Sequence, residues 1–494
     1  MTGNSRFFGL RDAPDSILRM ARTMSIFLPL IAATVTFSTT FYVIFIATAL
    51  GGGDYIQGMA LIGTLIVIQM AVQTVFDYPT GAVGDWIGQR YIISLSFGLY
   101  ALTFCLVSMV TVHTPYVLLV LIYAINGIAD AQQSGAWGAW FDNNYRVAMP
   151  NDVDRKQYGV MQGRIGMLFQ IISTLSLLPG SLMAVMFSRS WVFQLQAVLC
   201  VLIAASVLVV VQDLPEVKAV RQKKPSFAEY GSLLKAGVSY IFSEPFVKYV
   251  MIGSMVAASS IIVWGNLILF PMYYAYLATD VVVALFRTLL FIPGVASQER
   301  SGVWSRKFEP KKWIPRFRLV QMCGSVFFLV FAAIMYLLPP APAETPTIDI
   351  FFPFTQIVIL RLPPSTVLPV VLMFITFTVT GFFGGFAEIL TQRILIDAIP
   401  NRIRNSMYSL QPALGTIIAM PQIALFGWLI PRWGFPLTLV SCGIVSLVGV
   451  FMISKGLKYP LPVTGNEILV RRPQEASQPT EASVGATIRE KTSD

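Results

Sequence analysis

The chain has 494 residues, of which 55% are hydrophobic and only 12% are charged, whereas about a quarter of the residues of a soluble protein are charged. Its net charge of +10 would suit nucleic acid, but the basic residues lie in short segments between long apolar runs. Basic residues in such places meet anionic lipid headgroups. We therefore expect an integral membrane protein in a lipid bilayer, with no nucleic-acid partner.

Ten runs without Asp, Glu, Lys or Arg are long enough for the roughly 20 apolar residues that span a bilayer as a helix. They are residues 23–53, 55–76, 91–129, 165–188, 190–211, 249–279, 319–343, 362–387, 405–431 and 433–454. The run 91–129 is too long for one helix and divides at the turn Val112–Pro115, and a further span, 281–299, is interrupted by Arg287. The sequence thus predicts an all-α membrane protein with twelve transmembrane helices, because backbone groups in lipid must bond internally.

Charged segments divide the chain into two six-helix halves, which the similar loops PNDVDRKQY (150–158) and PNRIRNSMY (400–408) mark as pseudo-symmetric. With both termini in the cytoplasm, 31 of the 35 Lys and Arg residues fall on the inner side, which is the bias that fixes topology. We expect a multi-pass protein of the plasma (cell inner) membrane. Its parts are a cytoplasmic N-tail (1–22), a six-helix bundle (23–211), a cytoplasmic linker (212–245), a second six-helix bundle (246–457) and a disordered cytoplasmic C-tail (458–494).

Cysteine, histidine and glycine patterns point to no cofactor and no enzyme. The four cysteines lie inside apolar runs without a C-x-x-C pair, so neither disulfides nor zinc are expected. His113 falls in the outer turn between helices 3 and 4, and no phosphate loop for ATP occurs. The outer loop at roughly 339–365 is proline-rich at both ends and apolar in the middle. It is either a tether that dips into the outer interface or a lid over the outward mouth.

The stretch DYPTGAVGDWIGQR, between helices 2 and 3, resembles the loop signature of the major facilitator superfamily, Gly-x-x-x-Asp-x-x-Gly-x-Arg. The subgroup that it resembles is drug-efflux-like or uncharacterised, and the segments 132–143 and 396–410 resemble the end of helix 4 and the 10–11 loop of the same members. The resemblance implies the fold of that superfamily. The matching residues are Asp77, Gly81, Asp85, Gly88 and Arg90.

The chemistry of this stretch suits a conformational latch. We expect Gly81 and Gly88 to flank the turn and to permit close helix approach. An acid such as Asp85 can face the positive N-terminal end of a helix. The resemblance implies that this helix is the eleventh, so that opening toward the cytoplasm breaks the latch. The alternative is a solvated turn with ordinary topology charges, and Trp86 and Gln89 depart from the basic residues usual in the family.

Charges inside spans are functional candidates because each costs at least a few kcal/mol in lipid. The resemblance implies that helices 1, 4, 7 and 10 line the central cavity, which places Asp130 and Glu388 near the substrate path. A buried carboxyl group there can take up and release a proton near neutral pH. The alternative is a structural pair, Asp130 with Arg164 or Glu388 with Arg393. Candidate gate ion pairs nearer the cytoplasmic ends involve Asp142, Arg164, Arg393 and Asp397.

These observations predict a monomeric secondary transporter that works by alternating access. We expect proton-coupled efflux, by antiport, of a small amphipathic organic solute. Fold-level resemblance does not name the solute. The alternatives are an uncoupled facilitator or nutrient importer and, in a different class, a membrane sensor or embedded enzyme.

Overall fold

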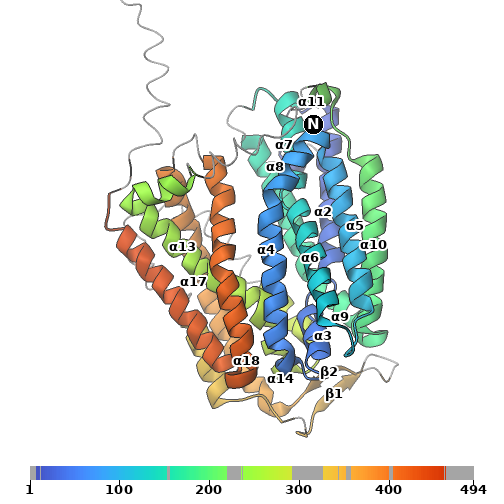
Figure 1. Cartoon of the computed structure of the whole chain (residues 1–494), viewed down its shortest axis with the longest axis vertical. Helices are drawn as coiled ribbons and strands as arrows, with labels where there is room; N and C mark the ends of the chain where they lie inside the picture. The colour runs from blue at the N-terminus through green and yellow to red at the C-terminus, as the bar shows by residue number, and fades with distance from the viewer. Residues whose placement is uncertain are drawn as a thin grey trace, which may run out of the picture.

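The computed structural model describes residues 7–11, 13–152, 156–219, 235, 237–291, 326–342, 344–351, 356, 358–399, 404–460 and 462. The helices run roughly parallel to one long axis (Figure 1). The described N-terminal residues and a short helix lie at one end, which we call the tail end. A two-stranded hairpin lies at the other, the hairpin end. Residues 220–234 and 236 of the predicted linker and nearly all of the C-tail lie outside the described residues.

Among the described residues, ten helices make up the N-terminal half. They are α2 (Asp15–Thr36), α3 (Tyr42–Leu50), α4 (Tyr55–Ile87), α5 (Gln89–Ser108), α6 (Tyr116–Gln133), α7 (Ala136–Ala148), α8 (Lys156–Leu175), α9 (Leu177–Met186), α10 (Arg189–Val210) and α11 (Pro215–Ala219). Three expected spans are each broken into two helices, namely α2 with α3, α6 with α7, and α8 with α9. The turn between the third and fourth spans is confirmed, with His113 exposed in it.

The C-terminal half is described in longer pieces and includes two short strands. Its elements are α13 (Pro245–Val263), the π-helical η1 (Trp264–Ile268), α14 (Leu269–Leu277), helical segments 280–291 and Val326–Leu337, β1 (Ile348–Phe351), β2 (Val358–Leu362), η2 (Pro364–Thr366), α17 (Val367–Ala398) and α18 (Arg404–Gly456). At Gly434, φ is 74° and the helical geometry of α18 is interrupted. This kink corresponds to the boundary between the last two expected spans.

Nine helices within the described residues are long and apolar enough to cross a membrane. Two of the expected spans share α18, and residues 292–325, which contain parts of two others, are not described. The arrangement is consistent with twelve spans. Helix α2 begins at Asp15 and carries Arg19 and Arg22, ahead of the apolar run from Thr23, because a helix continues into the headgroup region where charges are hydrated.

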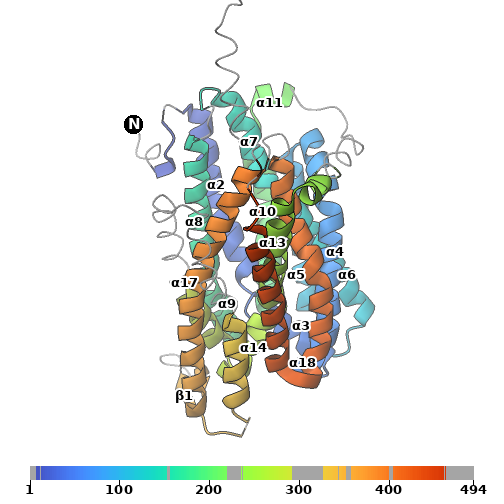
Figure 2. The same cartoon turned by 90° about the vertical axis from the view of Figure 1, so that its left-hand side faces the viewer.

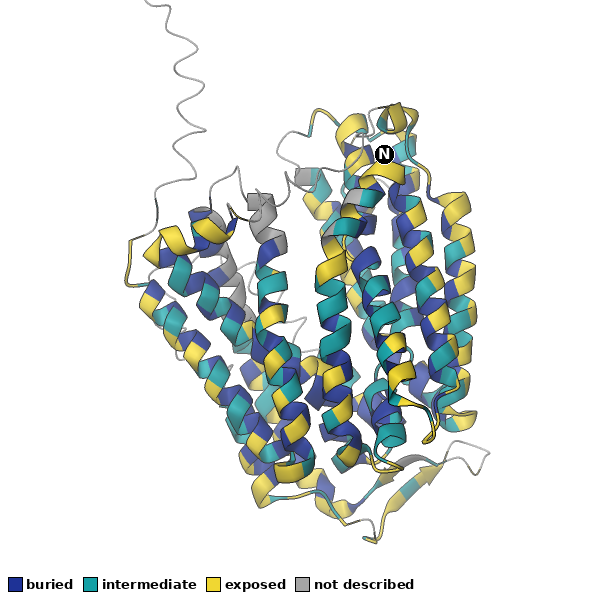
Figure 3. Cartoon of the chain, in the orientation of Figure 1, coloured by how far each residue is buried: buried dark blue, intermediate teal, exposed yellow. Residues whose placement is uncertain are grey.

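The surface of the bundle is apolar where a lipid-facing surface must be. Buried residues concentrate where helices face one another, and exposed residues lie on the outer faces (Figure 3). The outer faces carry large apolar side chains such as Val117, Val209 and Phe451, which are 77%, 71% and 71% exposed. Soluble monomers rarely expose so much apolar surface, so the bilayer is the solvent of these faces.

The hairpin is the part of the fold that the sequence did not predict. Strands β1 and β2 pair antiparallel, with Asp349 opposite Arg361, and the two side chains form an ion pair of 3.0 Å. The Arg361 guanidinium lowers the pKa of Asp349 below its usual value. Strand β2 contacts both α9 and α14. The predicted outer loop therefore contains regular structure that touches both halves.

The break between α2 and α3 is held by side chains from neighbouring helices. Gln196 of α10 donates its amide to the carbonyl oxygens of Thr34 and Val35, at 2.7 and 3.3 Å. Such bonds satisfy backbone groups that an interrupted helix leaves open, which is obligatory inside a membrane. Gly180 of α9 packs directly on the break, since a Cβ at this position would lie 2.0 Å from the carbonyl oxygen of Phe37.

Replacing Gly180 with Ala should destabilise the protein. The new methyl group meets rigid backbone, and overpacking of this kind costs about 1–3 kcal/mol. Thermal unfolding in detergent measures the effect. Gly166→Ala in α8 is the matched control, because nothing lies within 4 Å of its Cβ position. Equal unfolding temperatures for the two variants would contradict the packing described here.

Candidate functional site

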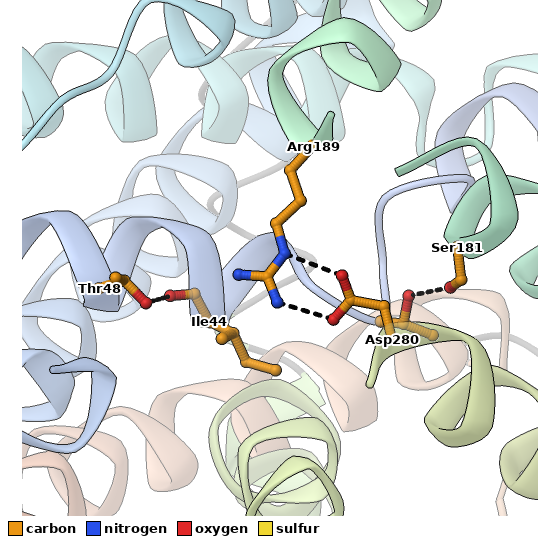
Figure 4. A network of polar contacts seen from close by, with 6 residues as sticks. Ile44, Thr48, Ser181, Arg189 and Asp280 are labelled. Atoms are coloured by element: carbon orange, nitrogen blue, oxygen red, sulfur yellow. Dashed lines mark hydrogen bonds and ion pairs between the residues drawn. The ribbon is translucent and has the colours of Figure 1, made fainter. Parts of the chain in front are cut away.

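Arg189 and Asp280 each begin a helix near the hairpin end, one in each half of the molecule. The guanidinium of Arg189 donates from Nε and Nη2 to the two carboxylate oxygens of Asp280, both at 2.8 Å (Figure 4). The side chains are only 22% and 6% exposed. A bidentate pair of this kind is both strong and directional, so it fixes the two halves against each other at this point.

Aromatic rings from both halves surround this pair. The Arg189 guanidinium lies 5.8 Å from the ring centroid of Phe41 and 5.4 Å from that of Tyr274. The Tyr274 ring in turn meets Tyr55 of α4 edge-to-face, with centroids 5.7 Å apart. The rings add cation–π attraction and exclude water from the ions. We call Arg189, Asp280, Phe41, Tyr55 and Tyr274 the hairpin-end gate.

Further contacts between the halves continue inward from this gate. The hydroxyl of Thr288 donates to the carbonyl oxygen of Thr174 in α8 at 3.4 Å. Helices α4 and α18 cross closely where Gly63 faces Gly427, since a Cβ on Gly427 would lie 3.1 Å from the Cα of Gly63. Toward the tail end the two helices draw apart (Figure 1), and Figure 2 shows the same bundle from the side of the C-terminal half. The halves are thus most tightly joined at the hairpin end.

At the tail end, the predicted latch stretch is more helical than expected. Helix α4 continues through Pro79 to Ile87. Gly81 lies inside it, with open space around its Cβ position, so the prediction that Gly81 flanks a turn was wrong. Gly88 alone makes the turn, with φ 113°, a conformation that other residues rarely adopt.

The polar residues of this stretch make local bonds. The carboxylate of exposed Asp85 accepts a hydrogen bond of 3.0 Å from the amide of Gln89. Arg90 lies over the ring of Tyr91. The carboxylate of Asp77 accepts a bond from the hydroxyl of Ser134, at the break between α6 and α7. Residues 400–403 and the side chains of 404–409 are not described, so the first turn of the helix that a latch would face lies outside the described part.

Asp130 lies inside the N-terminal half, with both carboxylate oxygens occupied. Gln69 of α4 donates its amide to Oδ2 at 2.7 Å, and Tyr100 of α5 donates its hydroxyl to Oδ1 at 2.5 Å. Tyr100 is itself 4% exposed. The structure therefore surrounds Asp130 with neutral donors from its own half.

The remaining predicted charges are only partly described. Asp142 pairs with Arg146 one turn along α7 at 2.8 Å. Arg164 donates to the carbonyl oxygen of Phe7 in the N-terminal segment. The side chains of Glu388, Arg393 and Asp397 lie outside the described part of α17. Among the described residues, no group of three or more His, Cys, Asp or Glu residues could hold a metal ion.

Sequence reasoning missed the hairpin-end gate, although a signal for it was present. Arg189, Arg287, Arg361 and Arg432 are the four basic residues that the topology does not assign to the inner side. A cation that does not follow the preference of basic residues for the inner side of the membrane needs a local partner. The nearest acid to Arg189 in the outer segments lies in the other half, so only the fold brings the two together.

Comparison with known proteins places this geometry among transporters. The family model for the Major Facilitator Superfamily matches residues 24–365, and no curated protein sequence matches the chain. Solved structures with a similar fold include the nucleoside transporter NupG, with TM-score 0.63 and 14% identity over 90% of this chain and 99% of that one. A D-xylose–proton symporter has TM-score 0.59 and 14% identity over 90% and 98%. The xylose transporter XylE from E. coli, in an inward-open conformation, has TM-score 0.56 and 12% identity over 89% and 96%.

Breaking the gate pair from one side should be strongly destabilising. Arg189→Gln leaves Asp280 buried without its counter-ion, which costs about 3–5 kcal/mol. The double variant Arg189→Gln with Asp280→Asn leaves no orphan charge and should recover much of that loss. Thermal unfolding of the two single variants and the double variant, treated as a double-mutant cycle, gives the coupling energy. Strictly additive losses would contradict a direct interaction.

Proposed function

This chain belongs to the major facilitator superfamily, and from that premise we propose that it moves a small organic solute by alternating access in which the hairpin-end gate is the outer gate. Secondary transport follows from the family and the fold. The observation that carries the finer proposal is the buried Arg189–Asp280 pair, because it joins the two halves at the hairpin end. Rocking of the halves about a central site would break it.

The basic residues support this orientation. Positive charge gathers at cytoplasmic ends of membrane helices, and the tail end carries Arg19, Arg22, Arg146 and Arg164. The hairpin end would then face outward, and the structure would represent a state closed to the outside. In that state the proposed latch at Asp85 is released, in agreement with the local bond of its carboxylate to Gln89.

Asp130 is our candidate for proton coupling among the described residues. In its ionised form it accepts from Tyr100 and Gln69 at once. A proton on either oxygen adds a donor that needs an acceptor of its own and removes the negative charge that strengthens these two bonds. Because the donors come from α5 and α4, protonation would change how three helices of the N-terminal half are tied together. Glu388 stays a second candidate on sequence grounds alone.

The direction of transport that we propose is export of an amphipathic solute against inward proton flow. Proton-coupled uptake is the second candidate, and the fold likeness to a D-xylose–proton symporter favours it. Flux of ethidium, uridine and D-xylose in proteoliposomes, with and without an imposed pH gradient of either sign, separates the two. Flux that is indifferent to the gradient would reject proton coupling and leave an uncoupled facilitator.

A cysteine below the gate should report its opening. In a background with the four native cysteines changed to serine, Thr174→Cys lies buried beneath Arg189 and Asp280. A membrane-impermeant maleimide added at the hairpin side should modify it slowly. Neutralising both gate residues, with Arg189→Gln and Asp280→Asn, should raise the rate by about tenfold or more, because the closed state loses a bidentate pair and each charged hydrogen bond is worth about 1.5–3 kcal/mol. Met109→Cys, exposed in the turn after α5, is the control whose rate stays constant.

Replacing Asp130 with Asn tests its role in coupling. The Asn oxygen can still accept from Tyr100, and the amide of Gln69 can turn so that its oxygen faces the Asn nitrogen. We therefore expect a folded protein whose solute flux no longer responds to the pH gradient. Tyr100→Phe keeps the titrating carboxyl group and should keep the response. Full gradient-driven transport by Asp130→Asn would exclude Asp130 as the proton carrier.

A further inference from the structure

Arg287 is a cation inside the helical segment 280–291 that the gate does not use. At about 1.5 Å per residue it lies roughly 10 Å along the helix from Asp280. An ionised residue at such depth is costly and ordinarily pairs with a counter-charge. Among the described residues, neither a carboxylate nor any other hydrogen-bond acceptor is bound to its guanidinium.

The helix presents Arg287 to the protein interior. Leu285 and Leu289 mark the outward face, each 43% exposed. Val283 and Leu290 are 0% and 2% exposed. With 100° between successive residues, Arg287 falls on the side opposite the two exposed leucines and within roughly 60° of both buried residues. The guanidinium therefore cannot be explained as a side chain reaching outward along the lipid-facing surface.

A second unused polar group lies beside Arg287. Tyr273 of α14 is 0% exposed, and its hydroxyl is buried without a hydrogen-bond partner among the described residues. The Tyr273 ring packs against Phe286, the residue directly before Arg287, with centroids 4.8 Å apart. Buried tyrosine hydroxyls nearly always find a partner. Two neighbouring donors without acceptors are what a site for an anionic group requires.

Aromatic rings line the same region. The Tyr273 ring meets Phe286 with centroids 4.8 Å apart, Trp264 at 6.2 Å and Phe331 at 6.5 Å. Trp264 begins the π-helical turn η1, and such turns often occur at functional sites. These rings would pack against an apolar or aromatic body attached to the anionic group.

We propose that Arg287 and Tyr273 bind the carboxylate, or another anionic head, of an amphipathic organic acid whose apolar body packs on the surrounding rings. That the acid is a transported solute rests on the function proposed above. The site adjoins the contact between the halves, since the next residue, Thr288, bonds to Thr174 of α8. The affinity of a ligand at this site would therefore depend on whether the two halves are closed against each other.

The test compares an acid with its neutral amide. We expect 3-phenylpropionate to bind the purified full-length protein in neutral detergent and to raise its unfolding temperature, and 3-phenylpropanamide to do neither. Arg287→Gln should weaken acid binding by about ten- to a hundred-fold, as expected for loss of hydrogen bonds to a charged group. Arg287→Lys should retain part of the affinity and Tyr273→Phe should lose several-fold. Arg432→Gln, which removes a cation stacked on Trp428, is the control and should bind as the unaltered chain does.

Two outcomes would overturn the proposal. One is acid affinity that is equal in Arg287→Gln and in the unaltered chain. The other is that the site binds an anionic lipid in place of the acid. In that case phosphatidylglycerol nanodiscs would give the unaltered chain, but not Arg287→Gln, a higher unfolding temperature than phosphatidylcholine nanodiscs do. Adding 3-phenylpropionate in phosphatidylcholine would then leave the unfolding temperature unchanged.

Failure of the site and failure of the transport proposal are distinguishable. Arg287-dependent binding of 3-phenylpropionate without any flux into proteoliposomes supports the site and contradicts transport of this acid. Flux of uridine or D-xylose through the Thr174-reported gate, with no binding of the acid, contradicts the site and leaves alternating access intact.

Discussion

The rest of the structure depends on the ion pair between Arg189 and Asp280. Burying two charges costs several kcal/mol per ion, and three features of this pair offset that cost: bidentate geometry, flanking aromatic rings, and the placement of Asp280 at the start of its helix. The helix dipole stabilises Asp280 in the first turn of its helix but destabilises Arg189 in the first turn of α10. The charge of Arg189 therefore depends more on the ion pair for its stabilisation than the charge of Asp280 does. Because the acid belongs to the other half, this need is met only while the hairpin end is closed.

Within the N-terminal half, the irregular backbone is held by side chains of that same half. Gln196 holds the break between α2 and α3, and Asp77 with Ser134 holds the break between α6 and α7. Non-helical backbone at membrane depth survives only where it is satisfied in this way. The bonds hold the N-terminal half together as a unit, so motion between the halves costs less than motion within this half. The gate and the Gly63–Gly427 crossing are then where a conformational change has to act.

The features that follow from local sequence could be predicted, and those that follow from long-range contact could not. Long apolar runs and the turn at His113 fixed the helices, because lipid allows few other structures. The continuation of α4 through Pro79 was missed, since Thr80 bonds to carbonyls of its own helix and of Ala131 and so supports the helix around this proline. The gate was missed because its two ions are distant in sequence. The hairpin was missed because strands this short are stabilised by their contacts with α9 and α14.

The two internal charges found in the described spans have opposite environments, and this difference argues for what each can do. Asp130 is surrounded by neutral donors, and a carboxyl group can also shed its charge by taking a proton. Arg287 has no such route, because a guanidinium does not give up its proton in proteins. Its charge is permanent, so a neutral interior around it requires an anion. No described residue supplies that anion. A bound acid would neutralise Arg287, and its release would leave the charge uncompensated, so the charge balance of the interior would depend on whether the site is occupied.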